Sequence, residues 1–270
     1  CDTGFGNRLA YRLNAMGFKV YATVLDKESV GAKYLLDNCL FKDRLKILAM
    51  NVTKRDDIDD VYTVVERDLI DNTESLYAIV NNAGITHLGH VDWGQMEGYK
   101  NVINVNTFGT VAVTLKFLPL IRHSKGRIVF MSSVNGRMTF QKASHYCMSK
   151  HAITAFSDAL RRELSRQWGV QVSTIEPAFY RTPLLADNNY KRVMDREWER
   201  TDTAVKEVYG QSYFESMGKM AQSIDYFVGN RIDDVVDNIV DRERTPSEWF
   251  DTIYNLIEKI TFRYESIEKV

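Results

Sequence analysis

The chain has 270 residues, of which 44% are hydrophobic and 26% are charged. This composition is typical of a folded globular protein and excludes a disordered, collagen-like or coiled-coil chain. The 35 basic residues nearly balance the 36 acidic ones, so the formal net charge is −1. Because binding to a phosphate backbone needs a basic surplus, nucleic acid is not expected as a partner.

Three cysteines, Cys1, Cys39 and Cys147, stand at unrelated spacings. They predict neither a disulfide framework nor a metal cluster, which fits a reducing or cytosol-facing compartment. The longest apolar stretch, residues 102–121, contains two asparagines and a lysine. It therefore predicts a buried helix rather than a membrane span.

Short apolar segments alternate with segments of helical spacing along most of the chain. The predicted strands cover residues 19–25, 45–50, 76–80, 127–131 and 170–175. The predicted helices cover residues 7–16, 29–38, 56–71, 95–121 and 144–168. This alternation indicates a doubly wound α/β fold, a Rossmann fold, in which helices cover both faces of a parallel sheet. No linker rich in Pro, Gly or Ser divides the chain, so we predict a single domain.

Within that domain we expect a dinucleotide-binding and catalytic core at 1–182, an excursion at 183–230 and a C-terminal helical region at 231–270. The excursion is rich in aromatic and Met residues at irregular helical spacing: Tyr190, Met194, Trp198, Tyr209, Tyr213, Phe214, Met217 and Met220. Two interpretations stay open. The segment either packs a small core of its own on the surface or forms a mobile cover over an apolar ligand.

Gly4 and Gly6 stand just ahead of the first predicted helix. Glycines there let backbone amides approach a pyrophosphate at the helix N-terminus, although a glycine pair before a helix is also common in a simple turn. The triplet Asp2-Thr3-Gly4 matches that of aspartic proteases. Their chemistry needs two carboxylates, and no second such triplet occurs, so this class is excluded.

The strongest chemical signal is Tyr146 with Lys150 four residues later and Ser133 upstream, at the end of a predicted strand. Residues four apart share one helix face, so the Lys150 ammonium is expected near the Tyr146 hydroxyl. A positive charge lowers the pKa of tyrosine from about 10 and suits it to proton transfer near neutral pH. Such a pair taken alone is more often a solvated surface pair, so the interpretation depends on the other motifs.

Those motifs occur in one order along residues 1–182 and closely resemble the short-chain dehydrogenase/reductases. They are Gly4-Phe5-Gly6, Asn81-Asn82-Ala83-Gly84, Asn106, Ser133, Tyr146-x-x-x-Lys150, and Pro177 to Thr182. Phrases such as Asn104-Val105-Asn106-Thr107-Phe108-Gly109-Thr110 are similar to the retinol dehydrogenase and 17β-hydroxysteroid dehydrogenase branch.

The resemblance implies four catalytic roles. Tyr146 is expected to be the general acid/base, and Lys150 to lower its pKa and bind the nicotinamide ribose. Ser133 is expected to orient the substrate oxygen, and Asn106 to hold a water that links Lys150 to solvent. The hydride chemistry belongs to the cofactor.

The resemblance also implies a set of cofactor-binding residues and no metal. They are Gly4, Phe5, Gly6, Asp26, Asn51, Val52, Asn82, Ala83, Gly84, Tyr146, Lys150, Pro177 and Thr182. Asp26 follows the second family strand, where an acidic side chain binds a ribose diol and repels a 2′-phosphate. Because Lys27 could serve such a phosphate, NAD is favoured and NADP stays open.

The histidines carry weaker signals. His87 and His90 lack a third neighbouring ligand, so a zinc site is not expected. His145, beside Tyr146, is expected to be a partly exposed helix residue, with a position facing the substrate cleft as the alternative.

The family begins with a central strand that would precede Gly4, so we expect this chain to be a fragment or an incomplete gene product. The expected activity is hydride transfer between a nicotinamide cofactor and a secondary or allylic alcohol or carbonyl of a lipophilic steroid or retinoid. The alternatives are an NADPH-dependent carbonyl reductase and a non-catalytic nucleotide-binding scaffold. The resemblance implies a homo-oligomer at the endoplasmic reticulum or another intracellular membrane, attached through residues absent from this chain, with a cytoplasmic location as the alternative.

Overall fold

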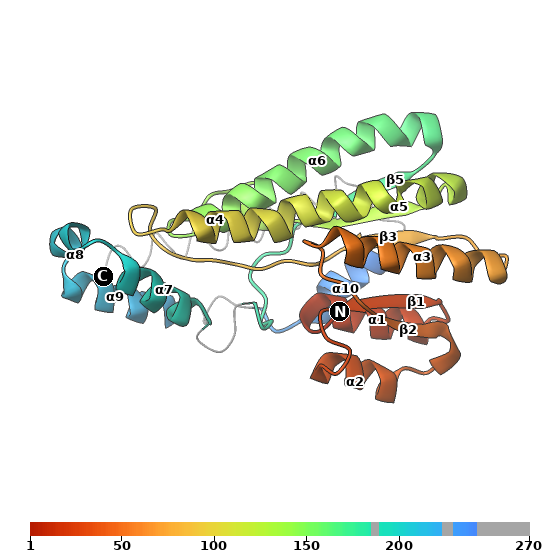
Figure 1. The fold of residues 1–270 in the computed structure, drawn as a ribbon, viewed down its shortest axis with the longest axis horizontal. Helices are drawn as coiled ribbons and strands as arrows, with labels where there is room; N and C mark the ends of the chain where they lie inside the picture. Colours follow the sequence, from red (N-terminus) through yellow and green to blue (C-terminus); the bar gives the residue numbers. More distant parts are fainter. Residues whose placement is uncertain (185–188, 223–228, 242–270) are drawn as a thin grey trace.

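A computed structural model describes residues 1–184, 189–222 and 229–241, in which strands and helices alternate as predicted (Figure 1). The strands are β1 (Val20–Val24), β2 (Leu45–Ala49), β3 (Ala78–Asn81), β4 (Arg127–Met131) and β5 (Gln171–Ile175). The helices are α1 (Gly4–Ala15), α2 (Val30–Asn38), α3 (Arg55–Asp71), α4 (Met96–Ile103), α5 (Thr110–Ser124), α6 (Ser144–Trp168), α7 (Asn189–Arg200), α8 (Thr203–Tyr209), α9 (Gln211–Gln222) and α10 (Ile232–Val240).

Two predicted helices differ from the observed ones. Helix α1 starts at Gly4, so Gly4 and Gly6 form its first turn instead of preceding it, and Gly4 has a φ of +61° that favours glycine. The helix predicted over 95–121 is interrupted by a π-helical turn at Asn104–Gly109, which separates α4 from α5. Such turns are often found at functional sites, and this one contains Asn106.

All strand pairs are parallel, and they form two sheets within the described residues. One sheet pairs β1 with β2, and the other has the order β3-β4-β5. The central strand expected ahead of Gly4 would lie between β1 and β3, and no strand joins these two in the described part of the chain. There the Cys1 amino group donates a hydrogen bond to the Thr23 carbonyl of β1.

Two helices pack across both sheets and so hold them together. Leu13 of α1 contacts the cores of the β1–β2 sheet and of the β3–β5 sheet. On the other face, α3 packs Ile58 and Val65 in a cluster that includes Tyr21 of β1 and Ile79 of β3. Helices thus cover both faces, as the doubly wound prediction requires.

Ser133 follows β4 of the second sheet, and Tyr146 and Lys150 lie on α6, which packs on that sheet. Ile153 and Leu160 of α6 pack with Ile121 of α5 against Ile128 and Phe130 of β4. The opposite face is covered by α1 and α10, which pack against β4 and β5. Because parallel strands end at one edge, the segments that follow β3, β4 and β5 meet there.

The excursion contains α7, α8 and α9, which we call the cover. Its buried Met194, Trp198 and Met217 pack around Trp93 of the core. The cover therefore packs its apolar side chains in a small core, and Trp93 of the main body is part of that core. Tyr190 and Met220, also named in the prediction, lie outside the residues whose side chains are described.

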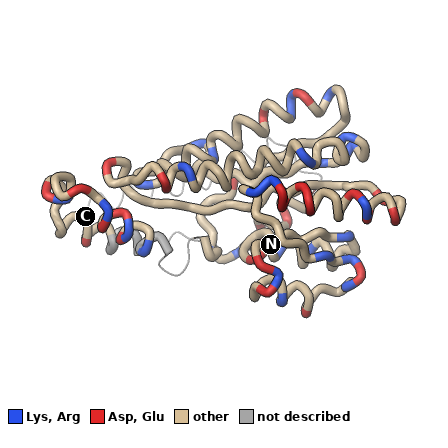
Figure 2. Tube along the Cα trace, in the orientation of Figure 1, with Lys and Arg blue, Asp and Glu red and all other residues tan. Residues whose placement is uncertain are grey.

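The helices carry charges of both signs on their outer surfaces. Lys and Arg alternate with Asp and Glu along the outer helices (Figure 2). Among the described residues, no helix has the length and apolarity needed to cross a bilayer. Of the C-terminal region predicted at 231–270, residues 232–240 form α10, and 242–270 lie outside the described residues.

Asp68 joins α3 to the β1–β2 sheet through three partners. It accepts hydrogen bonds from the Tyr21 hydroxyl and the Lys46 ammonium, both at 2.5 Å, and Lys19 lies 3.3 Å away. Lys46 and Tyr21, followed by Lys19, lower the pKa of Asp68 to about 2. Because this pKa is depressed on folding, the stabilisation is present above pH ~4 and is lost as the pH falls toward 2.

We predict that Asp68→Asn lowers the free energy of unfolding at pH 7 by about 1 to 2 kcal/mol, since an amide keeps the shape but loses the charge. Urea denaturation between pH 7 and pH 2.5 measures the effect, and the difference between variant and parent should shrink in acid. The control is Asp71→Asn, at an exposed position of the same helix. A difference that stays constant across this pH range would contradict the assignment.

Candidate active site

A cavity of about 1240 Å³ opens at the carboxyl ends of the strands. It extends from the first residues of α1, past the segments that follow β1, β2 and β3, to Ser133 and Tyr146. Met194 and Met217 of the cover also line it. The cavity is therefore long enough to touch both the opening glycines and the Tyr-Lys pair, which the sequence separates by more than a hundred residues.

The N-terminus of α1 forms one end of the cavity. The first N–H groups of a helix have no carbonyl partner within it, and they attract anions. A Cβ added at Gly4 would lie 3.6 Å from the Thr182 side chain, and one added at Gly6 would lie 2.6 Å from Nδ2 of Asn82. The structure thus gathers three separate predicted motifs around this helix end.

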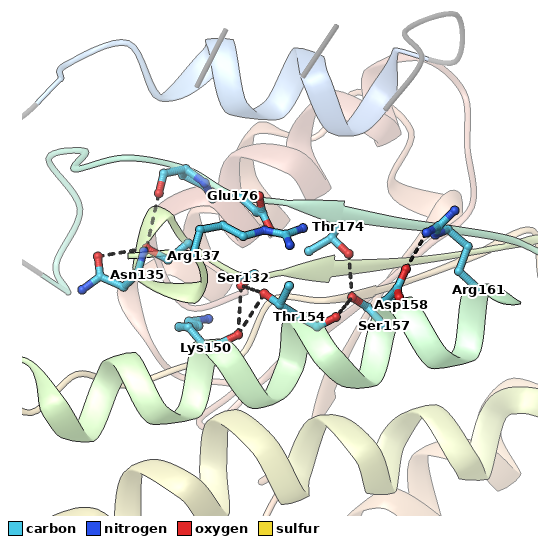
Figure 3. A network of polar contacts seen from close by, with 12 residues as sticks. Ser132, Asn135, Arg137, Lys150, Thr154, Ser157, Asp158, Arg161, Thr174 and Glu176 are labelled. Carbon is cyan, nitrogen blue, oxygen red and sulfur yellow. Dashed lines mark hydrogen bonds and ion pairs between the residues drawn. The ribbon is translucent and has the colours of Figure 1, made fainter. Parts of the chain in front are cut away.

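A buried polar network holds α6 against the ends of β4 and β5 (Figure 3). The Ser132 hydroxyl contacts Thr154 Oγ1 at 2.8 Å and donates to the Lys150 carbonyl at 3.2 Å. Ser157 contacts Thr174 of β5 at 2.7 Å. These contacts set the height and rotation of α6, and so they decide where its first two turns point.

Those turns present Tyr146 and Lys150 to the same region of the cavity, as the four-residue spacing predicted. The Lys150 ammonium lies 5.4 Å from the centre of the Tyr146 ring. It donates a hydrogen bond to the Met131 carbonyl at 2.6 Å. Burial lowers the pKa of Lys150 to about 8.

The expected lowering of the Tyr146 pKa does not occur in this arrangement. Burial raises the pKa of Tyr146 to about 12, and the hydrogen bond with Ser133 opposes this rise only in part. The Lys150 ammonium, which is hydrogen-bonded to the Met131 carbonyl, is not among the groups that shift this pKa. At neutral pH Tyr146 is thus a protonated phenol, able to donate a hydrogen bond or a proton.

Ser133 is held at the end of β4 by backbone groups. Its hydroxyl donates to the Pro177 carbonyl at 3.3 Å and accepts from the Asn135 N–H at 3.2 Å. Val134 N–H also binds the Pro177 carbonyl, at 3.0 Å. The segment after β5 is therefore fixed beside Ser133, which explains how a residue far along the chain reaches the site.

Asn106 lies in the π-helical turn and is almost fully buried. Its side chain accepts from Ile85 N–H at 2.8 Å and donates to the Ile85 carbonyl and to Ser149 Oγ, both at 2.9 Å. A Cβ added at Gly84 would lie 3.4 Å from Asn106 Oδ1 and 3.8 Å from Lys150 Nζ. Asn106 thus lies behind Gly84, joining the segment after β3 to α6.

Most predicted site residues line the cavity, and three do not. Those that line it are Gly4, Phe5, Asn51, Val52, Asn82, Ala83, Gly84, Ser133, Tyr146, Lys150, Pro177 and Thr182. Gly6 and Asn106 lie behind this lining, next to Asn82 and Gly84. Asp26 is exposed, and its carboxylate caps its own turn by accepting from Glu28 N–H at 2.9 Å.

Sequence reasoning missed Asp2 as a site residue. Its carboxylate accepts a hydrogen bond from Leu25 N–H at 3.0 Å, just after β1, and the residue lines the cavity. The sequence analysis assigns Asp2 no role in binding the cofactor. Its place directly ahead of Thr3-Gly4 was the available signal.

Both expectations for His145 were wrong. Its side chain is fully buried, and the residue does not line the cavity. Its ring stacks on Tyr99, with the ring centres 3.6 Å apart, and lies 4.4 Å from the His87 ring. The reason is that α4 packs against the first turn of α6, which fills the space that an exposed residue would need.

The cavity fits the nicotinamide dinucleotide that the family motifs imply. The α1 N-terminus with Gly4 would receive the pyrophosphate, and Asp2 and Asn51 line the cavity beside the segments that follow β1 and β2. Tyr146, Lys150 and Ser133, which line the same cavity, would face the nicotinamide and the reacting carbon.

The family model for short chain dehydrogenases matches residues 1–193. The chain is 40% identical over 238 residues to the mitochondrial D-beta-hydroxybutyrate dehydrogenase of Bos taurus, covering 86% of this chain and 68% of the relative. It is 40% identical to the 17-beta-hydroxysteroid dehydrogenase type 6 of Bos taurus, covering 80% and 66%. It is 39% identical to retinol dehydrogenase 16 of Rattus norvegicus, covering 83% and 69%. The chain thus spans about two thirds of the length of these relatives.

The fold agrees with a solved structure of a short-chain dehydrogenase from Streptomyces avermitilis. The TM-score is 0.70 at 22% identity, covering 99% of this chain and 94% of the other. Together with the match over residues 1–193, these findings show that the chain belongs to the short-chain dehydrogenase/reductase family.

Proposed function

We propose that this protein is an NAD-linked alcohol dehydrogenase that transfers a hydride between the cofactor and a secondary or allylic alcohol of a lipophilic substrate. The observation that carries the proposal is the meeting of Tyr146, Lys150 and Ser133 at one end of the cavity. When bound, the nicotinamide ring supplies the hydride acceptor or donor. The chain's own residues bind, orient and exchange a proton.

Tyr146 exchanges that proton with the substrate oxygen. In the reducing direction its phenol donates directly, since burial keeps it protonated at neutral pH. In the oxidising direction it must first lose its proton, and the Lys150 ammonium is the positive group placed to stabilise the phenolate. Ser133 orients the substrate oxygen. Asn106 holds the segment after β3 against α6 and, as proposed, a water beside Lys150.

An apolar substrate is supported by the cavity lining, which includes Met194, Met217, Phe179 and Leu184. Thioether side chains adapt to irregular apolar shapes. Two relatives are named for a hydroxysteroid and for retinol. We therefore propose a steroid or a retinoid as substrate. From the family resemblance we also propose a homo-oligomer at the endoplasmic reticulum or another intracellular membrane.

We predict that Tyr146→Phe lowers kcat by about 100- to 10,000-fold, the usual contribution of a general acid or base. The assay follows NADH absorbance with estradiol, retinol and D-β-hydroxybutyrate offered in turn. Cofactor affinity should change little, because Phe keeps the ring. A variant with near-normal kcat would contradict the role of Tyr146, and an unmodified chain inactive on all three alcohols would favour a non-catalytic scaffold.

For the cofactor, we predict that NADH binds more tightly than NADPH, because the Asp2 carboxylate, held at Leu25 N–H just after β1 in the cavity lining, would repel a 2′-phosphate. Asp2→Asn should reduce this preference roughly tenfold, the effect of about 1.4 kcal/mol of lost repulsion. Fluorescence titration with each nucleotide gives the two Kd values. Asp26→Asn is the matched control and should leave the ratio unchanged. If only Asp26→Asn changes the ratio of the two Kd values, Asp26 and not Asp2 sets the cofactor preference.

A further inference from the structure

A second group of buried titratable side chains lies beside the cavity, on the side of the cover. Glu197 of α7 is almost fully buried, at 3% exposure. One of its carboxylate oxygens accepts a hydrogen bond from Gln95 N–H at 2.8 Å, at the start of α4. The other oxygen lies 3.5 Å from Nε2 of His87, in the segment that follows β3.

The contact from Glu197 continues into the catalytic helix. The His87 ring lies 4.4 Å from the ring of His145, and His145 stacks on Tyr99 at 3.6 Å. The Tyr99 hydroxyl contacts Ser144 Oγ at 2.8 Å. Ser144 and His145 are the first two residues of α6, directly ahead of Tyr146.

Packing leaves little freedom in this group. A Cβ added at Gly98 of α4 would lie 2.9 Å from Cε1 of His87, and one added at Gly94 would lie 3.4 Å from Cε1 of His145. Both nitrogens of His145 are buried without a hydrogen-bond partner in the described residues. The ring is thus held by shape and stacking, and its position depends on that of His87.

Burial shifts both histidines of this group toward their neutral forms. Burial and the neighbouring His87 lower the pKa of His145 to about 4, so His145 is neutral at pH 7. Burial also lowers the pKa of His87, and Glu197 opposes this only in part. A carboxylate at the N-terminus of α4 is stabilised by the unpaired N–H groups and the dipole of that helix. Glu197 thus binds, from the cover, the N–H of Gln95, the residue directly ahead of the first turn of α4.

We propose that Glu197 is a positioning residue that fixes the cover, the start of α4 and the first turn of α6 in one arrangement. Through the Gln95 N–H it ties α7 to α4, and through His87 and His145 it sets the turn that carries Tyr146. This inference rests on the proposed function only for its activity readout. A substrate bound under Met194 and Met217 would depend on the same arrangement.

Hydrogen exchange followed by mass spectrometry tests the proposal on the unmodified chain and three variants. Glu197→Ala should raise amide exchange roughly tenfold in residues 94–103 and 144–151, as expected when a hydrogen bond to a buried charge is lost. Glu197→Gln should keep the protection of 94–103, because its amide oxygen still accepts from Gln95. It should loosen 144–151, because the amide oxygen is used by Gln95 and an NH2 group then replaces the carboxylate oxygen that lies 3.5 Å from His87 Nε2. Exchange within α3 serves as the internal reference for folding.

The matched control is Glu199→Ala, at an exposed position of the same helix, which should leave both segments unchanged. Loosening confined to α7 in the Ala variant, or an unchanged 144–151 in the Gln variant, would overturn the proposal. The Gln variant decides alone if the Ala variant does not fold.

With estradiol or retinol as substrate, Glu197→Gln should raise KM several-fold and lower kcat, with the Kd for NADH unchanged. A loss that falls on NADH affinity instead would contradict a role at the cover. The exchange measurement needs no substrate. A chain inactive on every alcohol would therefore refute the proposed function, while the exchange data would still decide the role of Glu197.

Discussion

A buried ammonium group, that of Lys150, sets the constraint on which the rest of the site depends. Lys150 is 5% exposed and donates to the Met131 carbonyl at the end of β4. A buried charge must be matched by hydrogen bonds, so α6 has to meet β4 at this height. The Ser132–Thr154 and Ser157–Thr174 contacts fix the same register along the helix. Tyr146, one turn earlier, is then aimed into the cavity.

The two-sheet framework explains how distant motifs reach this point. α1 and α3 each pack across both sheets, so the start of α1 and the ends of β3 and β4 keep fixed relative positions. Parallel strands deliver the segments after each of them to one edge. The cavity is the space left where those segments meet. Met194 and Met217 of the cover line part of it, and they pack in a core shared with Trp93.

Local patterns predicted well what depends on local geometry. Alternating apolar segments indicated every observed strand, and the spacing of Tyr146 and Lys150 placed both on one helix face. Gly17 and Gly169 follow the ends of their helices with positive φ, which glycine adopts readily. Local patterns predicted less where a distant partner decides. The Asp26 carboxylate accepts a hydrogen bond from Glu28 N–H in its own turn, whereas the Asp2 carboxylate accepts one from Leu25 N–H. His145 is buried because α4 packs over it. The pKa of Tyr146 rises because the residue is buried among the segments that meet at the cavity.

Burial keeps Tyr146 a protonated phenol, and its pKa must fall for the site to oxidise an alcohol. Carbon-13 labelling of the tyrosine ring carbon that bears the hydroxyl, with the Tyr146 signal assigned by its loss in Tyr146→Phe, would follow this one group by NMR as the pH is raised. We expect the signal to remain that of a phenol beyond pH 10 without cofactor and to titrate at a lower pH once NAD⁺ is added. A Tyr146 signal that titrates like a solvent-exposed tyrosine, or that ignores NAD⁺, would contradict the proposed role in proton transfer.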